Sequence, residues 1–112
     1  MKKTLLLAVV LFSLAGPLMA VGVNGDAVAG KQKAAACAAC HGADGNKTLD
    51  NTYPKLAGQY ADYLVKALKE YKSGKRNNAI MAAQAQALTE ADMANLAVYY
   101  QSLKSEIGTL KK

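Results

Sequence analysis

The sequence predicts an all-α domain. Apolar residues recur at helical spacing in the second half of the chain, and no stretch alternates as a half-buried strand does. Helix-capping residues, Asp26 and Thr89, stand before the first and the last expected helix. Because the sequence contains no long-period repeat, we expect a single domain.

The first residues are typical of an export signal. Two early lysines supply positive charge, an apolar run follows from 5 to 15, and a Gly-Pro break leads to the small residue Ala20. We therefore expect residues 1–20 to be a signal peptide that is cleaved after Ala20, and residues 21–112 to be the exported domain, located in the periplasm. The alternative is an uncleaved anchor, because residues 5–23 are mostly apolar and nearly as long as a membrane span.

The first helix is expected from Ala27 to Ala35. The Asp26 carboxylate can accept hydrogen bonds from the first free amides, and the alanines that follow are the best helix formers. This helix should end near the two cysteines. The stretch 42–58 is rich in Gly, Asn, Asp and Pro, which favour turns, so a long loop is expected there.

A middle helix and a last helix are indicated by two apolar stripes. The middle stripe should end at Gly74, and its members are Tyr60, Leu64, Ala67, Leu68 and Tyr71. The last helix should begin after Thr89 with a capping box, and its buried stripe is Met93, Leu96, Ala97, Tyr100 and Leu103. Between them, residues 75–78 should be irregular and residues 80–88 partly helical.

Composition and charge limit the function. The chain has a net charge of +6, which falls to about +4 without the two leader lysines, so acidic partners are favoured only mildly. No basic stripe with a recognisable nucleic-acid module is present, which argues against nucleic-acid binding. Every aromatic residue after the leader is a tyrosine and alanine is abundant. Such a core is thin unless a large flat group fills it.

The motif Cys37-Ala38-Ala39-Cys40-His41 carries the strongest chemical signal. Two thiols at this spacing can add to the two vinyl groups of a haem, and the adjacent imidazole can reach the iron. A structural zinc site is a weaker interpretation, because it needs about four ligands. A thiol redox pair is also weaker, because it would stand at the start of a helix after a strand, whereas this pair follows a helix.

The order of the expected elements resembles the class I cytochromes c over essentially all of residues 21–112. Three segments, YPKLAGQ at 53–59, YKSGKR at 71–76 and LTEAD at 88–92, together with Met81, are similar to one half of the two-haem periplasmic cytochromes c and to their small single-haem relatives. The resemblance implies a class I cytochrome c fold, with about four to five helices wrapped around one covalently bound haem c.

The resemblance also implies a role for individual residues. Cys37 and Cys40 would attach the haem, and His41 and Met81 would be the two axial ligands of its iron. Pro54 would accept a hydrogen bond from the free ring N–H of His41 through its backbone carbonyl. Elimination agrees with Met81, because two of the other three methionines leave with the signal peptide and the third is in the last helical stripe.

Two further sets of residues match positions in that family. Gly30 and either Tyr99 or Tyr100 correspond to the contact where the first and last helices cross, which is structural. Residues 76–78 could meet a haem propionate, tune the Met81 sulfur or form a solvated turn. The basic residues of the middle helix could steer an acidic redox partner or be a solvated face; they are Lys66, Lys69, Lys72, Lys75 and Arg76.

The function implied is electron transfer without substrate turnover, by a carrier of one electron between exported or membrane redox partners. Those partners would be membrane respiratory complexes or periplasmic oxidoreductases, with no nucleic acid and no stable membrane insertion after cleavage. The first alternative is a small haem peroxidase or gas-binding protein in which Met81 does not bind. The second is a module without haem that uses its cysteines as a disulfide or thiol pair.

Overall fold

The computed structural model describes residues 2–12 and 22–107. The expected cleavage site after Ala20 lies outside the described residues. Residues 2–12 are exposed and form neither helix nor strand. In the part of the chain that is described, no helix is long and apolar enough to span a bilayer.

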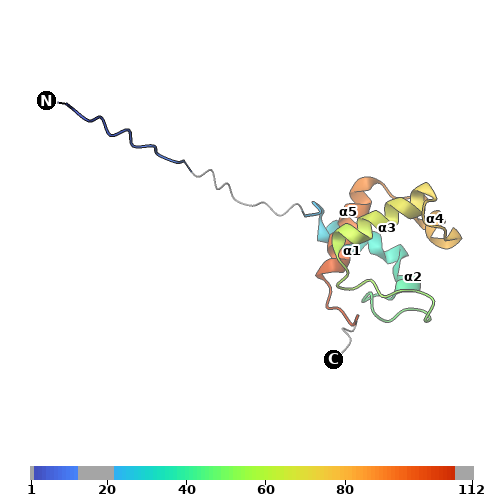
Figure 1. The fold of residues 1–112 in the computed structure, drawn as a ribbon. Helices are drawn as coiled ribbons and strands as arrows, with labels where there is room; N and C mark the ends of the chain where they lie inside the picture. The colour runs from blue at the N-terminus through green and yellow to red at the C-terminus, as the bar shows by residue number, and fades with distance from the viewer. Residues whose placement is uncertain (1, 13–21, 108–112) are drawn as a thin grey trace.

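The all-α prediction is confirmed, since the described residues form helices and no strand (Figure 1). In chain order the elements are α1 (Ala27–Lys33), the 3-10 turn η1 (Ala34–Ala36), α2 (Ala38–His41), α3 (Ala61–Ser73), α4 (Ala79–Gln86) and α5 (Glu90–Ser102).

Helix α1 begins where the sequence predicts and ends earlier. The Asp26 carboxylate accepts hydrogen bonds from the amides of Val28 and Ala29, at 2.8 and 3.2 Å. The α-helical bonding stops at Lys33, and the chain tightens into η1, where the Cys37 amide donates to the Ala34 carbonyl at 2.9 Å. Tightening of a last turn into 3-10 geometry is common at helix ends. It lets the cysteine motif begin a helical turn of its own.

The first and last helices, α1 and α5, pack against each other (Figure 1). The Asn95 side chain of α5 accepts a hydrogen bond from the Asp26 amide at 2.8 Å, which ties the start of α1 to α5. A capping box of Thr89 and Asp92 starts α5, as the sequence predicts. Lys33 of α1 forms an ion pair with Asp92 at 3.3 Å. These contacts hold the element that precedes the cysteines.

The buried core lies between α1, α3 and α5, and it is made mostly of small side chains. Among the described residues, ten apolar side chains are buried and six of them are alanines. Met93 is the largest side chain that is almost completely buried. Half-buried apolar side chains border this core, among them Leu56, Val65, Leu68 and Leu88. The expectation of a thin core is met.

One sequence prediction on the middle of the chain needs correction, and another is confirmed. Tyr60 belongs to the apolar stripe predicted for the middle helix, but it is 74% exposed because it is the extended residue before the first turn of α3. Residues 80–88 are predicted to be partly helical, and Met81 lies inside α4. Gly74 ends α3 as predicted, with a left-handed φ of 81° that favours glycine.

Candidate functional site

The cysteine motif is itself helical, and this determines how its side chains are arranged. Cys37 is the N-cap residue of α2, and the His41 amide donates to the Cys37 carbonyl at 2.9 Å. Residues three and four apart in a helix lie on the same face, so Cys37, Cys40 and His41 share one side of this turn. Both cysteines are half-buried and not joined to each other. One flat molecule could therefore meet two thiols and an imidazole at once.

His41 is oriented by the long loop that follows it. Its ring is 6% exposed, and Nδ1 lies 2.8 Å from the Pro54 carbonyl oxygen, which is the contact that the sequence predicts. Because a carbonyl can only accept, Nδ1 carries the proton and donates it, and Nε2 keeps its lone pair for a metal. The Tyr53 ring meets the imidazole edge-on, with centroids 6.2 Å apart. The loop thus fixes both the tautomer and the orientation of the ring.

The environment of Cys37 disfavours a thiol redox pair. Burial raises the pKa of the Cys37 thiol and is the largest influence on it. A reactive pair needs a thiol whose pKa is lowered, usually by a helix N-terminus or a nearby cation. Although Cys37 caps α2, that helix has only four residues and does not reverse the effect of burial. The Cys37 thiol therefore lacks the lowered pKa of a redox-active thiol.

Met81 is supplied by α4. Its side chain is partly buried, and the α4 turn that carries it is capped by Asn78, whose side-chain oxygen accepts a hydrogen bond from the Met81 amide at 2.9 Å. Met93, by contrast, is 1% exposed in the core of α5, in agreement with its assignment to packing. Of the two methionines in residues 22–107, Met81 is therefore the more accessible.

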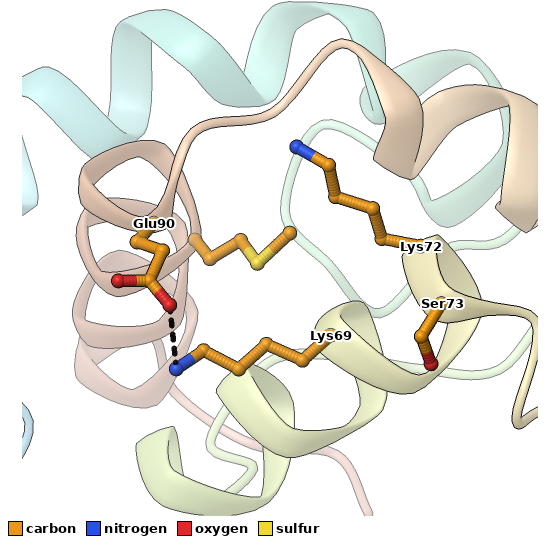
Figure 2. Close-up of a pocket in the computed structure, with 5 residues that line it drawn as sticks. Lys69, Lys72, Ser73 and Glu90 are labelled. Atoms are coloured by element: carbon orange, nitrogen blue, oxygen red, sulfur yellow. Dashed lines mark ion pairs between the residues drawn. The ribbon is translucent and has the colours of Figure 1, made fainter.

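One cavity among the described residues lies away from the cysteine motif. It has a volume of about 290 Å³ and is bordered by α3 and α5 side chains, which are Lys69, Lys72, Ser73, Glu90 and Met93. Figure 2 shows Lys69 paired with Glu90 across it, at 3.1 Å. A smaller cavity of about 170 Å³ is bordered by residues of α1, η1, the α2 region and α5. Neither cavity is lined by Cys37, Cys40, His41 or Met81.

The basic residues of α3 and of the turn after it are largely engaged within the protein. Glu70 pairs with Lys66 at 2.7 Å and with Lys75 at 3.9 Å. Lys72 donates to the Leu88 carbonyl, and its ammonium group points toward the segment before α5 in Figure 2. Arg76 donates to the Tyr63 hydroxyl. These contacts weaken the idea of a free cationic docking face.

The residues present fit a covalently held haem. The motif offers two half-buried thiols and one buried imidazole whose free nitrogen is Nε2, and α4 offers a thioether. The alanine-rich core leaves half-buried apolar side chains that a flat apolar ring system can cover. Within the described residues, no group of three His, Cys, Asp or Glu side chains forms a separate metal site.

Comparison with known proteins agrees with this chemistry. The sequence model of the family described as cytochrome c matches residues 27–104. The chain belongs to the cytochrome c family. Its Cys37 and Cys40 have the spacing that attaches one haem c through two thioether bonds, and the haem iron supplies one-electron redox chemistry.

Within this family, cytochrome c4 of Pseudomonas aeruginosa is 48% identical over 84 residues, which are 75% of this chain and 41% of that protein. Cytochrome c-554(548) of Halomonas halodenitrificans is 47% identical over 81 residues, which are 70% of this chain and 96% of that protein. The crystal structure of reduced cytochrome c4 from Pseudomonas stutzeri superposes with a TM-score of 0.67 at 39% identity, covering 72% of this chain and 47% of the other.

The chain thus spans about half the length, or less, of the cytochrome c4 relatives that it matches. This agrees with the predicted resemblance to one half of a two-haem cytochrome. A protein of Thiomonas intermedia described as a thiosulfate dehydrogenase electron acceptor is also 44% identical over 72 residues, which are 64% of this chain and 33% of that protein.

The structure gives two asparagines roles that the sequence analysis left open. Asn46 lies in the expected loop and is 7% exposed; its side-chain NH2 donates to the Lys104 carbonyl, and its side-chain oxygen accepts a hydrogen bond from the Glu106 amide, both at 2.9 Å. It fastens the end of the described chain to the loop after His41. Asn78 caps α4, and its position directly before an alanine-rich stretch was a signal that could have revealed it.

Proposed function

We propose that this protein carries one electron on a covalently attached haem c and shuttles it between exported or membrane-bound redox partners. Cys37 and Cys40 hold the haem, and His41 and Met81 are the axial ligands of the iron. A His/Met pair leaves no open coordination position, so the iron exchanges electrons without turning over a substrate. The observation that carries the proposal is the His41 Nδ1 contact with the Pro54 carbonyl, which leaves Nε2 for iron.

Each protein group has a separate task in this proposal. The thioether bonds keep the haem in place in both oxidation states, so that no binding equilibrium accompanies electron transfer. The Pro54 carbonyl holds the imidazole and increases its basicity. The Met81 thioether stabilises the reduced iron and raises the reduction potential. The half-buried apolar side chains that border the core would exclude water from the iron.

The proposal extends to location and partners. Residues 1–20 would be a cleaved signal peptide and residues 21–112 the cytochrome c domain, which would act in the periplasm. The lysines and apolar run of the leader support export. The similarity to an electron acceptor of a dehydrogenase supports a periplasmic oxidoreductase or a respiratory complex as the partner. Protein purified from the periplasm should begin at Val21, and retention of residues 1–20 would contradict the cleavage.

The direct test is an absorption spectrum of oxidised and reduced protein, with the intact mass of the same sample. The full chain is produced together with haem-attachment machinery. One covalently added haem, sharp reduced c-type bands and a weak Met–iron band in the oxidised protein are expected. Covalent haem without that band would contradict the electron-shuttle proposal and favour a haem protein whose iron has an open coordination position. A mass equal to the polypeptide would favour the thiol module.

Two methionine variants identify the sixth ligand. Met81→Ala should keep the covalent haem, lose the Met–iron band, lower the potential and allow the reduced iron to bind CO. Met93→Leu is the matched control, since it removes a buried thioether of similar volume and should cost less than about 1.5 kcal/mol of stability. Loss of the band in Met93→Leu alone would show that the ligand had been assigned to the wrong methionine.

A further inference from the structure

We propose that Tyr63, Tyr71, Arg76 and Asn78 form a latch that positions Met81, so that they control how often the thioether leaves the iron. The inference rests on the proposed ligation of iron by Met81. From the sequence, Arg76 and Asn78 could contact a haem propionate, tune the Met81 sulfur or form a solvated turn. In the structure, both residues have specific partners within the protein. These four are positioning residues, because they act through the helical turn that carries Met81.

The latch begins where α3 ends. At Gly74 the chain turns back, and the Arg76 amide donates to the Glu70 carbonyl at 3.1 Å. This turn brings the Arg76 side chain back along α3. Its Nη1 donates to the Tyr63 hydroxyl at 3.1 Å, and its guanidinium carbon lies 4.9 Å from the centre of the Tyr71 ring.

The two tyrosines fit this role because of their spacing. They are eight residues apart in one helix, so they lie two turns apart on nearly the same face. A planar guanidinium can donate to a hydroxyl while it covers an aromatic ring. The guanidinium is cationic in proteins at any ordinary pH, and the hydrogen bond to Tyr63 raises the pKa of Arg76 further. Arg76 therefore fixes the segment that connects α3 to α4.

Asn78, two residues further along, transmits this fixed position to Met81. Its backbone is extended, its side-chain oxygen accepts the Met81 amide at 2.9 Å, and its carbonyl accepts the Ala82 amide at 2.8 Å. Both bonds belong to the first turn of α4. The backbone of Met81 is thus attached through Asn78 to a segment that Arg76 anchors on α3.

Polar contacts matter here because α4 contributes little to the apolar core of the polypeptide. The helix buries one residue, Ala85, against its protein neighbours. Helix α4 packs on α3. Its C-terminal end is held there by Gln86, which donates to the Lys72 carbonyl at 2.9 Å. Without the cap at the other end, the first turn of α4 should fray more often than the rest of the fold.

The experiment compares Asn78→Ala with Asn78→Ser in the intact holoprotein. Loss of the cap should raise the population of the frayed turn about fivefold. Hydrogen exchange of the Ala82 amide, whose acceptor is the backbone carbonyl of residue 78 and is kept in both variants, and CO binding to the reduced protein should both accelerate by about that factor, since CO can enter only after Met81 has left. Serine can also cap a helix, and should restore most of both effects.

Tyr63→Phe and Lys75→Ala provide a second, matched pair. Tyr63→Phe removes only the hydroxyl that Arg76 contacts, and should accelerate the same two processes. Lys75→Ala removes a neighbouring charge whose ion pair with Glu70 is long, at 3.9 Å, and should leave both rates unchanged. If Asn78→Ala yields no folded protein, Tyr63→Phe and Asn78→Ser decide the question.

The outcomes separate this inference from the proposed function. A wild-type Met–iron band with unchanged exchange and CO rates in Asn78→Ala and Tyr63→Phe would overturn the latch alone. If the wild-type protein lacks that band, Met81 is not an iron ligand. The latch could then not control how often the thioether leaves the iron. The exchange rate of the Ala82 amide would still report whether these residues fix the turn. Equal acceleration in Lys75→Ala would also overturn the latch, because it would show a general charge effect.

Discussion

Gly30 in α1 lies so close to Tyr99 in α5 that a Cβ atom added to the glycine would be 2.8 Å from the Cβ of the tyrosine. The added atom would also overlap the Asn95 carbonyl, which is backbone and cannot move aside alone. The two helices therefore meet at a contact that only glycine permits. The sequence left Tyr99 and Tyr100 as alternatives for this contact, and the structure assigns it to Tyr99.

Replacing Gly30 with alanine should push α1 away from α5. We expect a loss of about 1–3 kcal/mol in the free energy of unfolding, which is typical of overpacking. Denaturant unfolding of the holoprotein measures it. Gly22→Ala is the control, since nothing lies within 4 Å of its added Cβ. Equal stability of the two variants would show that the helices can separate without cost.

Tyr100→Ala should be more destabilising than a typical surface change. The ring is 4% exposed in the core, and the Tyr100 carbonyl accepts the Gly58 amide at 2.8 Å, so the residue joins α5 to the long loop. Loss of a packed ring costs about 3–5 kcal/mol. Tyr100→Phe keeps the ring and should lose much less, as thermal unfolding would show. Similar losses in both variants would place the stabilisation in the hydroxyl group.

Asp92 should make stability depend on pH in the acid range. Hydrogen bonds from Thr89 are the main cause that lowers the pKa of this carboxyl, and Lys33 adds to the effect. A lowered folded pKa means that the stabilisation is complete above the unfolded value, about 3.9, and is lost as the pH falls through the folded value.

Asp92→Asn keeps an acceptor oxygen but removes the charge. We expect it to lower stability at pH 7 by at most about 1 kcal/mol, because the ion pair with Lys33 is near the surface. The difference from wild type should vanish at the most acidic pH, where the wild-type carboxyl is protonated. Unfolding curves across the acid range measure this. A difference that persists unchanged in acid would contradict the pKa assignment.

Pro54→Ala tests whether the loop needs the proline ring or only its carbonyl. The hydrogen bond from His41 reaches the backbone oxygen, which alanine retains. We therefore expect an unchanged reduction potential and a loss of about 0.4–1 kcal/mol, from the greater freedom of the unfolded chain. Electrochemistry and thermal unfolding on one sample separate these effects. A changed potential would mean that the ring itself holds the carbonyl in place.

Local patterns accounted for much of this fold. Asp26 and Thr89 cap their helices as expected, and Gly74 ends α3, because capping depends on a few neighbouring residues. The resemblance to class I cytochromes also placed the contact between His41 and the Pro54 carbonyl. In both cases the sequence holds the required information within one short segment or one recognisable motif.

What the sequence did not reveal depends on elements that meet only after folding. Tyr60 fits the helical period of α3, but the helix begins one residue later, so its ring is in solvent. The hydrogen bond from Arg76 to Tyr63 spans thirteen positions and exists because the chain reverses at Gly74. Two basic residues of α3 also find partners far along the chain. Lys69 pairs with Glu90 of α5, and Lys72 donates to the Leu88 carbonyl just before α5. Helical periodicity in the sequence does not predict contacts of this kind.

The alanine-rich core has a consequence for the life of the protein in the cell. A polypeptide whose buried side chains are mostly alanine gains little free energy by folding without haem. We therefore expect haem attachment and folding to occur together. Molecules that miss haem attachment should remain open to proteases and disappear. The steady-state amount of this protein would then report how well the cell delivers haem, and iron starvation should remove the polypeptide as well as its colour.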